Sequence, residues 1–341
     1  MRVTLKDIAQ EAGVSVSMVS YVLNKSGRLT KEKHKQIMEI ANKYNYVPDA
    51  NAKSLVTGVT NNVGFMINKD REALFQQPFI MQCIGELSGC LREYSGWLSL
   101  CMAQDMDAGE LRHYLANANF DGIVFMFATQ QQEKVKLLRD RKIPCVFLDS
   151  GIVEDDLANI YCNDELGISM EVDHLAAMGH KKILFLAAKD THPLSGDLRR
   201  SAYEQAVRSH GLFYEKAVYT GYERRDIYKA LDQLIGGGEW PTAMVAASDK
   251  IAWGAIDYLR EHGIRVPEDI SVTGFDDVDM GRNEEYGLTT VRQPVHEMIV
   301  DCVNYIYECQ ESGELKPYYR KWDPSLIVRS STGKVSDIAQ A

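Results

Sequence analysis

The strongest constraint on this sequence lies in its first two dozen residues, which form two short amphipathic segments separated by a tight turn. Thr4, with Asp7 three residues later, resembles a capping box at the start of a helix. Gly13 supplies a backbone that turns without steric cost, and Ser15 is a candidate N-cap for the second segment. The apolar residues of each segment share one helical face: Leu5, Ile8, Ala9 and Ala12 in the first, Val19, Val22 and Leu23 in the second. This pattern predicts a helix-turn-helix.

The polar face of the second segment favours contact with the major groove of DNA, because its side chains are small or hydrogen-bonding and carry no bulky charge. Val16 can meet a thymine methyl group, while Ser17 and Tyr21 can bond to base edges. A plain helical hairpin that packs against another element has the same pattern, so the motif alone leaves both functions open. The candidate base-contacting residues are Val16, Ser17, Ser20, Tyr21 and Asn24.

Two motifs resemble those of the lactose/galactose repressor (LacI/GalR) family. The run V-T-L-K-D-I-A-Q-E-A-G-V-S-x-S-x-V-S-x-V-L-N, residues 3–24, is similar to the DNA-binding headpiece of that family. The run Y-N-Y-V-P-D-A-N-A-K-S-L, residues 44–55, is similar to the link between headpiece and core. The resemblance implies a transcriptional repressor that binds a palindromic operator in double-stranded DNA as a homodimer and responds to a small-molecule effector. The headpiece set that it implies also contains Thr4 and Ser15.

The link between headpiece and core has a specific role in the family that it resembles. Residues 49–56 are too few for a stable isolated helix, because helices under about 12 residues are marginal in water. In the family this segment becomes a hinge helix only on DNA, where a leucine from each subunit wedges into a base step of the minor groove. Leu55 matches that leucine, and Lys53 stands where the family more often has Arg. A plain linker with a core-facing leucine is the alternative.

The charge distribution separates the headpiece from the rest of the chain. The 341 residues carry a net charge of −10, yet residues 1–60 hold nine Lys and Arg against five Asp and Glu, a net of +4. The remaining residues hold 29 Lys and Arg against 43 Asp and Glu, a net of −14. A basic module on an acidic body is typical of a protein that contacts phosphate with one end only.

The composition predicts a cytoplasmic protein with no membrane partner, and the resemblance implies a bacterial one. Apolar runs fall short of the roughly 20 residues needed to span a bilayer, and the N-terminus lacks the apolar stretch of a signal peptide. Seven cysteines without a C-x-x-C motif favour reduced thiols with packing roles over disulfides or a metal site. We therefore expect neither a metal nor another cofactor.

From residue 62 onward, apolar runs alternate with amphipathic helices, which predicts an α/β architecture. Most runs are unbroken, as expected for parallel strands covered by helices on both faces. The predicted strands are Val63–Ile67, Leu98–Met102, Gly122–Phe127, Cys145–Leu148, Ile160–Cys162, Ile183–Leu186, Ala243–Ala247, Ser271–Phe275 and Leu288–Val291. This length suggests two doubly wound lobes, and the resemblance implies a core like that of periplasmic binding proteins.

The expected organisation has three parts. Residues 1–47 form the helix-turn-helix domain, 48–59 the hinge helix or linker, and 60–341 the effector-binding and dimerisation core. Within the core we expect lobe 1 at about 60–160 plus 292–322, and lobe 2 at about 161–291 plus 323–331.

Polar residues follow the predicted strands, and ligands of open α/β sheets bind outside the carboxyl ends of strands. These residues are Asn68, Asp149, Asn163, Ser248, Asp249, Asp276, Asp277 and Gln293. Carboxylates and amides facing each other across two lobes suit a polyhydroxy ligand, because each carboxylate accepts from two hydroxyls. Asp249 and Asp277 are as well suited to capping the following helix.

The resemblance implies a specific effector set. Arg199 matches the arginine of the family's R-x-x-G-F pattern, Asp276 its F-D-D aspartate, and Tyr222 an aromatic residue that packs on a sugar face. The full set is Phe79, Asp149, Ser195, Arg199, Tyr222, Ser248, Asp276 and Gln293. A sugar is the expected effector, and a nucleobase or other metabolite acting as co-repressor is the alternative, since Ser248 stands where the family often has Asn.

An enzyme with an incidental N-terminal domain is the competing interpretation. The sequence contains no G-x-S-x-G, H-E-x-x-H or G-x-x-x-x-G-K-[ST] motif. Asp276 and Asp277 are adjacent, so they cannot face each other as a catalytic carboxylate pair. We therefore predict that the chain is not an enzyme.

Overall fold

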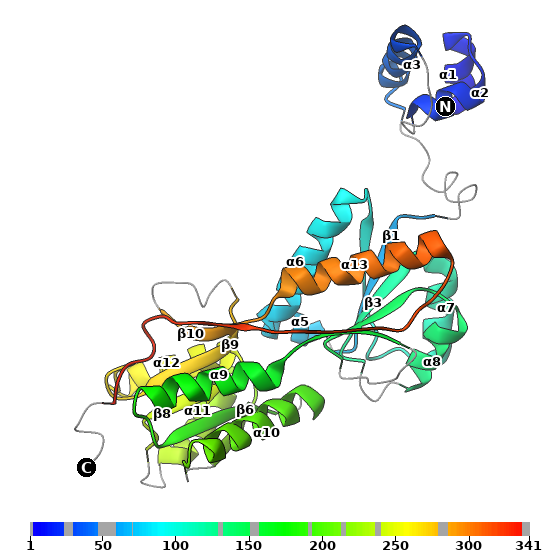
Figure 1. The fold of residues 1–341 in the computed structure, drawn as a ribbon. Coiled ribbons are helices and arrows are strands. Elements are labelled where there is room, and N and C mark those ends of the chain that lie inside the picture. Colours follow the sequence, from blue (N-terminus) through cyan, green and yellow to red (C-terminus); the bar gives the residue numbers. More distant parts are fainter. Residues whose placement is uncertain are drawn as a thin grey trace. The chain divides into compact units, whose positions relative to one another are not determined.

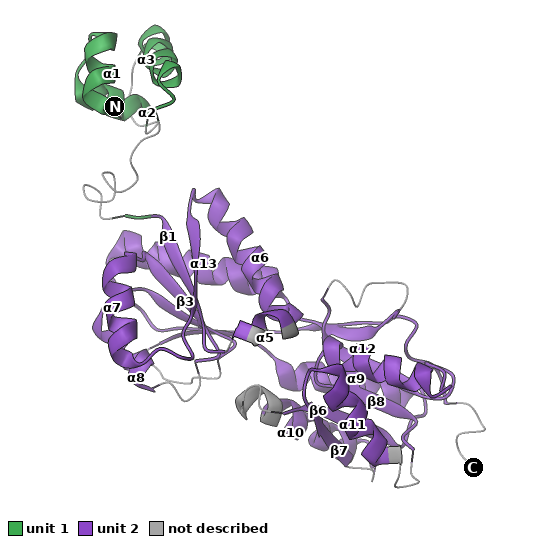
Figure 2. Ribbon diagram, turned by 180° about the vertical axis from the view of Figure 1, so that it is seen from behind, with its two compact units in different colours: residues 1–60 green, residues 61–341 purple. Residues whose placement is uncertain are grey.

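The computed structural model describes residues 3–23, 30–46, 59–69, 71–128, 132–150, 157–189, 193–212, 216–235, 240–278 and 286–335, with a few side chains in helices α5, α10 and α11 excepted. The chain divides into two compact units, Met1–Thr60 and Asn61–Ala341 (Figure 2). Three predicted DNA-binding residues, Asn24, Lys53 and Leu55, lie outside the described residues.

The first unit is a three-helix headpiece that contains the predicted helix-turn-helix. Its helices are α1 (Leu5–Ala12), α2 (Val16–Leu23) and α3 (Lys31–Lys43). The Asp7 carboxylate accepts hydrogen bonds from the backbone N–H and the hydroxyl of Thr4, at 2.8 and 2.7 Å. Gly13 turns the chain at φ 62°, and the Ser15 hydroxyl accepts from the Met18 N–H at 3.2 Å. The buried residues that join the three helices are Ile8, Ala9, Ala12, Val19, Val22, Ile37 and Ala41.

The second unit contains two parallel sheets, each with helices on both faces, which confirms the predicted α/β fold (Figure 1). The sheet of lobe 1 has the order β11-β5-β4-β3-β1-β2. Its strands are β1 (Asn62–Ile67), β2 (Trp97–Met102), β3 (Gly122–Met126), β4 (Cys145–Leu148), β5 (Ala158–Cys162) and β11 (Tyr318–Trp322). Its helices are α5 (Arg71–Gln76), α6 (Pro78–Glu93), α7 (Ala108–Ala118), α8 (Gln132–Asp140) and α13 (Val295–Ser312).

The sheet of lobe 2 has the order β12-β10-β9-β8-β6-β7, and β12 is antiparallel to β10. Its strands are β6 (Ile183–Ala188), β7 (Lys216–Thr220), β8 (Ala243–Ala246), β9 (Ser271–Asp276), β10 (Thr289–Arg292) and β12 (Ser325–Ile327). Its helices are α9 (Asp164–Ala177), α10 (Pro193–Ser209), α11 (Arg224–Ile235) and α12 (Asp249–Glu261). Helix α9 packs on α10, and α11 packs on α12.

The chain passes between the two lobes three times. It leaves lobe 1 after β5, returns after β10, and leaves again after β11 to add β12 to the other sheet. Each lobe is therefore completed by a late segment of the chain.

Two predictions about local structure were incomplete. The stretch from Asn68 to Phe79, for which no helix was predicted, contains α5 and then the start of α6, where Pro78 occupies the first helical position. Strands β7, β11 and β12 were not predicted. All three are outer strands of their sheets, and their exposed side chains interrupt the apolar runs on which the prediction relied.

Candidate functional site

A pocket lies in the second unit where the carboxyl ends of strands from both lobes meet. Its residues border about 630 Å³ of space not filled by atoms, part of which is open to solvent. Lobe 1 contributes the start of α6 and the residues after β3 and β4, and lobe 2 contributes the ends of β6, β8, β9 and β10 with α10 and α12. The lining residues are Gln77, Pro78, Phe79, Phe127, Asp149, Ala188, Arg199, Tyr222, Ala247, Ser248, Lys250, Asp276, Val278 and Gln293.

The backbone is strained at this edge. Phe127, Asp149 and Asp276 end or follow β3, β4 and β9, with φ of 59°, 46° and 113°. Such backbone is costly for residues other than glycine, by about 1–3 kcal/mol each, and persists only where the surroundings impose it. Three such residues around one cavity indicate that their side chains are held in place for a purpose.

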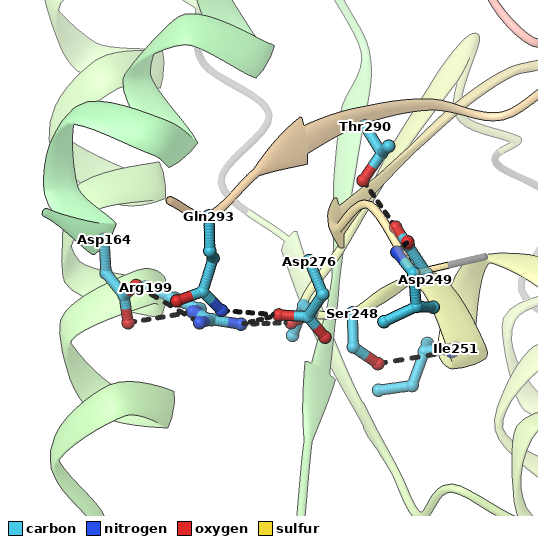
Figure 3. Close-up of polar contacts among 10 residues, drawn as sticks. Asp164, Arg199, Ser248, Asp249, Ile251, Asp276, Thr290 and Gln293 are labelled. Atoms are coloured by element: carbon cyan, nitrogen blue, oxygen red, sulfur yellow. Dashed lines mark hydrogen bonds and ion pairs between the residues drawn. The ribbon is translucent and has the colours of Figure 1, made fainter. Parts of the chain in front are cut away.

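Arg199 organises the buried charges of the wall (Figure 3). Its Nε and Nη2 atoms donate to the two carboxylate oxygens of Asp164, at 2.9 and 3.1 Å. Its Nη1 atom donates to the carbonyl oxygen of Ala247 at 2.7 Å and lies 3.9 Å from Oδ1 of Asp276. The guanidinium stacks over the Phe275 ring, 3.7 Å from its centroid. Most of its donors are therefore taken by the protein.

Asp276 and Gln293 form the second part of the wall. The Gln293 Nε2 atom donates to Asp276 Oδ1 at 2.8 Å, which points the amide oxygen elsewhere. That oxygen has no hydrogen-bond partner among the described residues, and the side chain that carries it is buried, with 2% of its surface exposed. An unsatisfied buried acceptor of this kind costs about 1–3 kcal/mol and marks a position for a donor.

The carboxyl groups of the wall hold protons unusually well. Burial raises the pKa of Asp149 to about 7, and the nearby Asp164 carboxylate adds to this effect. Burial also raises the pKa of Asp276 to about 7, although Arg199 and the Gln293 amide oppose the shift. Burial disfavours the charge of Arg199, yet Asp164 and Asp276 raise its pKa above the ordinary value. No cluster of three or more His, Cys, Asp or Glu suited to a metal occurs in the described part of the chain.

Seven of the eight predicted effector residues line this one cavity: Phe79, Asp149, Arg199, Tyr222, Ser248, Asp276 and Gln293. The eighth, Ser195, lies in α10, and its side chain is outside the description. Ser248 also caps α12, because its hydroxyl accepts from the Ile251 N–H at 3.4 Å.

The other polar residues that follow strands have structural partners. Asn163 caps α9 and donates to Asp323 at 2.8 Å. Asp249 accepts from the Thr290 hydroxyl and from the Val278 N–H. Asp277 accepts from Arg292 and Arg329, each at 2.7 Å. Sequence position at a strand end did not separate these residues from the pocket residues.

Three polar residues in or beside the site were not predicted from the sequence. Asp164 is adjacent to the predicted strand-end residue Asn163, but its pairing with Arg199, 35 residues away, has no sequence signal. Gln77 directly precedes α6 and follows α5, a helix that was not predicted. Lys250 directly follows Ser248 and Asp249, and its position in the first turn of α12 could have been inferred from that cap.

The headpiece presents the predicted DNA-contacting face to solvent. Tyr21 is 55% exposed and Val16 39%, and Ser17 is also exposed. Ser20 is half-buried. The side chains of Thr4 and Ser15 take part in the helix caps described above.

Two family models match the chain. The model described as "Bacterial regulatory proteins, lacI family" matches residues 4–49, and the model described as "Periplasmic binding protein-like domain" matches residues 172–332. Within the described residues, none of the helices combines the length and apolar character needed to cross a bilayer.

Relatives cover nearly the whole chain. A protein of Haemophilus influenzae (strain PittEE) named HTH-type transcriptional repressor PurR is 31% identical over 343 residues, spanning 97% of this chain and 99% of that protein. A PurR of Mannheimia succiniciproducens is 29% identical over 339 residues, 98% of this chain and 99% of that protein. Among solved structures, the lac repressor dimer bound to operator and the anti-inducer ONPF matches with a TM-score of 0.82 at 24% identity, covering 98% of this chain and 100% of that one.

Proposed function

The chain belongs to the LacI family of bacterial regulatory proteins, as a DNA-binding repressor with an effector-binding unit, and we propose that its effector is a carbohydrate bound in the pocket between the two lobes. The headpiece would contact operator DNA through α2, and the effector would change operator affinity through the lobes. A ligand shifts such an equilibrium only through its different affinities for the two states. A pocket built from both lobes meets this requirement, because rotating one lobe against the other changes its walls.

The observation that carries the carbohydrate proposal is the excess of hydrogen-bond acceptors in the wall. Asp149, Asp276 and Gln293 line a cavity in which most donors of Arg199 are already bound, and the buried amide oxygen of Gln293 has no partner among the described residues. A ligand rich in donors satisfies such a wall, and a polyol carries one donor on every hydroxyl. Phe79, Phe127 and Tyr222 supply apolar surface for the C–H face of a sugar ring.

A nucleobase acting as co-repressor is the second candidate, because the relatives named PurR suggest purine control. A purine presents ring nitrogens and carbonyls that need donors as much as acceptors. The described wall favours the sugar on this ground. Two proteins of the same fold, the transcriptional regulator CelR in complex with cellobiose and a LacI family transcriptional regulator of Enterococcus faecium with bound ribose, agree with this choice.

Asp276→Asn should weaken binding of the effector by about 1.5–3 kcal/mol, because it replaces a charged acceptor with a neutral amide of the same shape. The ligand is first identified by thermal stabilisation of the full chain with a panel of sugars and nucleobases. Affinity is then measured by calorimetry at about pH 8, where the wild-type carboxylate is ionised.

Asp277→Asn is the matched control, because Asp277 is the next residue but its carboxylate pairs with Arg292 and Arg329 rather than lining the pocket. This variant should lower the free energy of unfolding and leave ligand affinity within a few-fold of wild type. Equal ligand affinities for wild type and Asp276→Asn would place the effector elsewhere. Stabilisation by nucleobases alone would replace the sugar with the second candidate.

Tyr21→Ala should cost about 1–3 kcal/mol of binding to the preferred operator and little on random DNA, since the exposed ring and hydroxyl are available to base edges. Ser17→Ala should act in the same direction. Fluorescence anisotropy with both DNAs at one salt concentration measures the difference. An equal loss on both DNAs would mean that these side chains touch only the phosphate backbone.

The assembly should be a homodimer, because a twofold dimer presents two headpieces to the half-sites of a palindrome. Family members that form tetramers use a C-terminal heptad helix, and the tail here has few apolar positions for one. The described part of that tail is also bound to lobe 2, where Thr332 pairs with His174 at 3.0 Å and the Gly333 carbonyl accepts from His180 at 3.0 Å. Light scattering at micromolar concentration should give two chains, and a value of four would contradict the prediction.

A further inference from the structure

Lys250 adds a positively charged side chain to the pocket, and the hydrogen-bond acceptors of the wall do not account for it. It is the second residue of α12, it is half-buried, and it lines the same cavity as Asp149 and Asp276. Among the described residues it has neither a hydrogen bond nor an ion pair within 4.0 Å. A lysine stem that is half-buried in a pocket wall places its ammonium group at the cavity, where it can meet a bound anion.

The two cations of the pocket differ in what they can offer a ligand. Arg199 is held by both oxygens of Asp164 and by the Ala247 carbonyl, so its charge is neutralised within the wall. Around Lys250 the acidic side chain whose field acts on it is Glu223, and burial nevertheless lowers the pKa of the lysine. The ammonium of Lys250 therefore keeps its donors for a bound molecule.

The start of α12 adds to this positive side. Ala247, Ser248 and Lys250 all line the cavity, so the N-terminal turn of a 13-residue helix borders it. The first amide groups of a helix carry a partial positive charge that favours anions. Helix and lysine thus lie on one side of the pocket, where the first residue of the helix, Asp249, is fully buried and bonded to Thr290 and to the Val278 N–H.

We infer that the effector is a carbohydrate bearing an anionic substituent, a carboxylate or a phosphate, and that Lys250 binds this substituent while the acceptor wall binds the hydroxyls. This inference rests on the carbohydrate function proposed above and makes it more specific. Hexuronates and sugar phosphates are the two classes that carry both chemistries. In either class, the anionic group would form the ion pair that Lys250 does not form with the described residues of the wall.

The test compares matched sugars on the full chain. Glucose, glucuronate and glucose 6-phosphate form one series, and galactose, galacturonate and galactose 6-phosphate the other. Thermal stabilisation should be larger for an acidic member than for the neutral sugar of its series, and the better acidic class identifies the substituent. Calorimetry with that sugar should show a roughly 10- to 100-fold loss of affinity for Lys250→Met, since a hydrogen bond to a charged group is lost.

Lys250→Arg should recover part of the affinity, because it keeps the charge. Lys229→Met, which removes an exposed lysine from the neighbouring helix α11, should leave affinity unchanged. If neutral and acidic sugars bind equally well, or if Lys250→Met binds the acidic sugar as well as wild type does, the inference is overturned. Loss of binding in Asp276→Asn would then still support the sugar pocket, whereas stabilisation by nucleobases alone would refute both.

Discussion

Arg199→Met is expected to lower the free energy of unfolding of the full chain by about 3–5 kcal/mol. The substitution keeps much of the side-chain volume but removes the cation that lies between two buried carboxylates. Asp164 would lose both of its hydrogen bonds, and Asp276 would lose its nearest positive charge. Breaking a buried pair on one side costs more than the pair contributes, because the remaining charge is desolvated without a partner. Urea denaturation monitored by tryptophan fluorescence measures the loss.

Arg200→Met is the matched control, since Arg200 is the next residue of α10 and its partner Glu204 lies at 3.4 Å in a partly exposed i,i+4 pair. Such pairs contribute at most about 1 kcal/mol. The Arg199 effect should also shrink as the pH falls below about 7, because burial raises the pKa of Asp276 to about 7 and its protonation removes one of the two unpaired charges. Similar losses for the two variants would show that the Asp164–Arg199–Asp276 group stabilises the fold no more than an exposed ion pair does. In that case, weaker ligand binding by an Arg199 variant could not be attributed to a loss of folding.

Glu171→Gln is expected to flatten the dependence of stability on pH. Glu171 lies in α9, is fully buried, and has no hydrogen-bond partner for either carboxylate oxygen among the described residues. Burial raises its pKa well above the ordinary value of 4.5; the Thr273 hydroxyl lies close enough to oppose this, though not within hydrogen-bond geometry. The folded chain therefore favours the neutral form of this side chain, whereas the unfolded chain lets it ionise at its ordinary pKa.

The direction in which pH changes the stability follows from proton linkage. Above pH 4.5 the unfolded state releases the proton of Glu171 and the folded state keeps it, so stability falls as pH rises toward the raised pKa. While the folded state keeps the proton, the loss approaches about 1.4 kcal/mol per pH unit for one proton. Glutamine has nearly the same shape and carries no proton to lose, so the variant should avoid this loss.

Urea denaturation at three pH values gives the slope for wild type and variant. Glu165→Gln, which changes an exposed glutamate in the same helix, should leave the slope as it is in wild type. A Glu171→Gln variant whose stability falls as steeply with pH as wild type would mean that Glu171 is ionised in the folded chain.

Most of the fold could be predicted because buried parallel strands are continuous apolar runs. Cys145–Leu148 coincides with β4 at both ends, and Val63–Ile67 differs from β1 by one residue. The missed strands show the limit of this signal. In β11 the sequence Y-Y-R-K-W is mostly exposed, and its strand character comes from pairing with β5, some 160 residues earlier, which local pattern does not contain.

The residues of the site also divide into those that local sequence could predict and those that it could not. Strand-end position predicted Asp149 and Asp276 because parallel strands bring their carboxyl ends to one edge. The same rule also selected Asp249 and Asp277, whose partners Thr290 and Arg329 become neighbours only in the folded chain. Which carboxylate faces the cavity is decided by tertiary pairing.

The three passages of the chain between the lobes also set the order in which the protein can fold as it is synthesised. Residues 318–322 form β11 of one sheet, and residues 325–327 form β12 of the other. Until the ribosome has released these residues, β5 and β10 remain open edges that other growing chains can pair with. Neither lobe can finish its sheet early, so both must be completed almost together, near the close of translation of this unit. The nascent chain is therefore most exposed to misassembly, and most dependent on chaperones, just before residue 318 emerges.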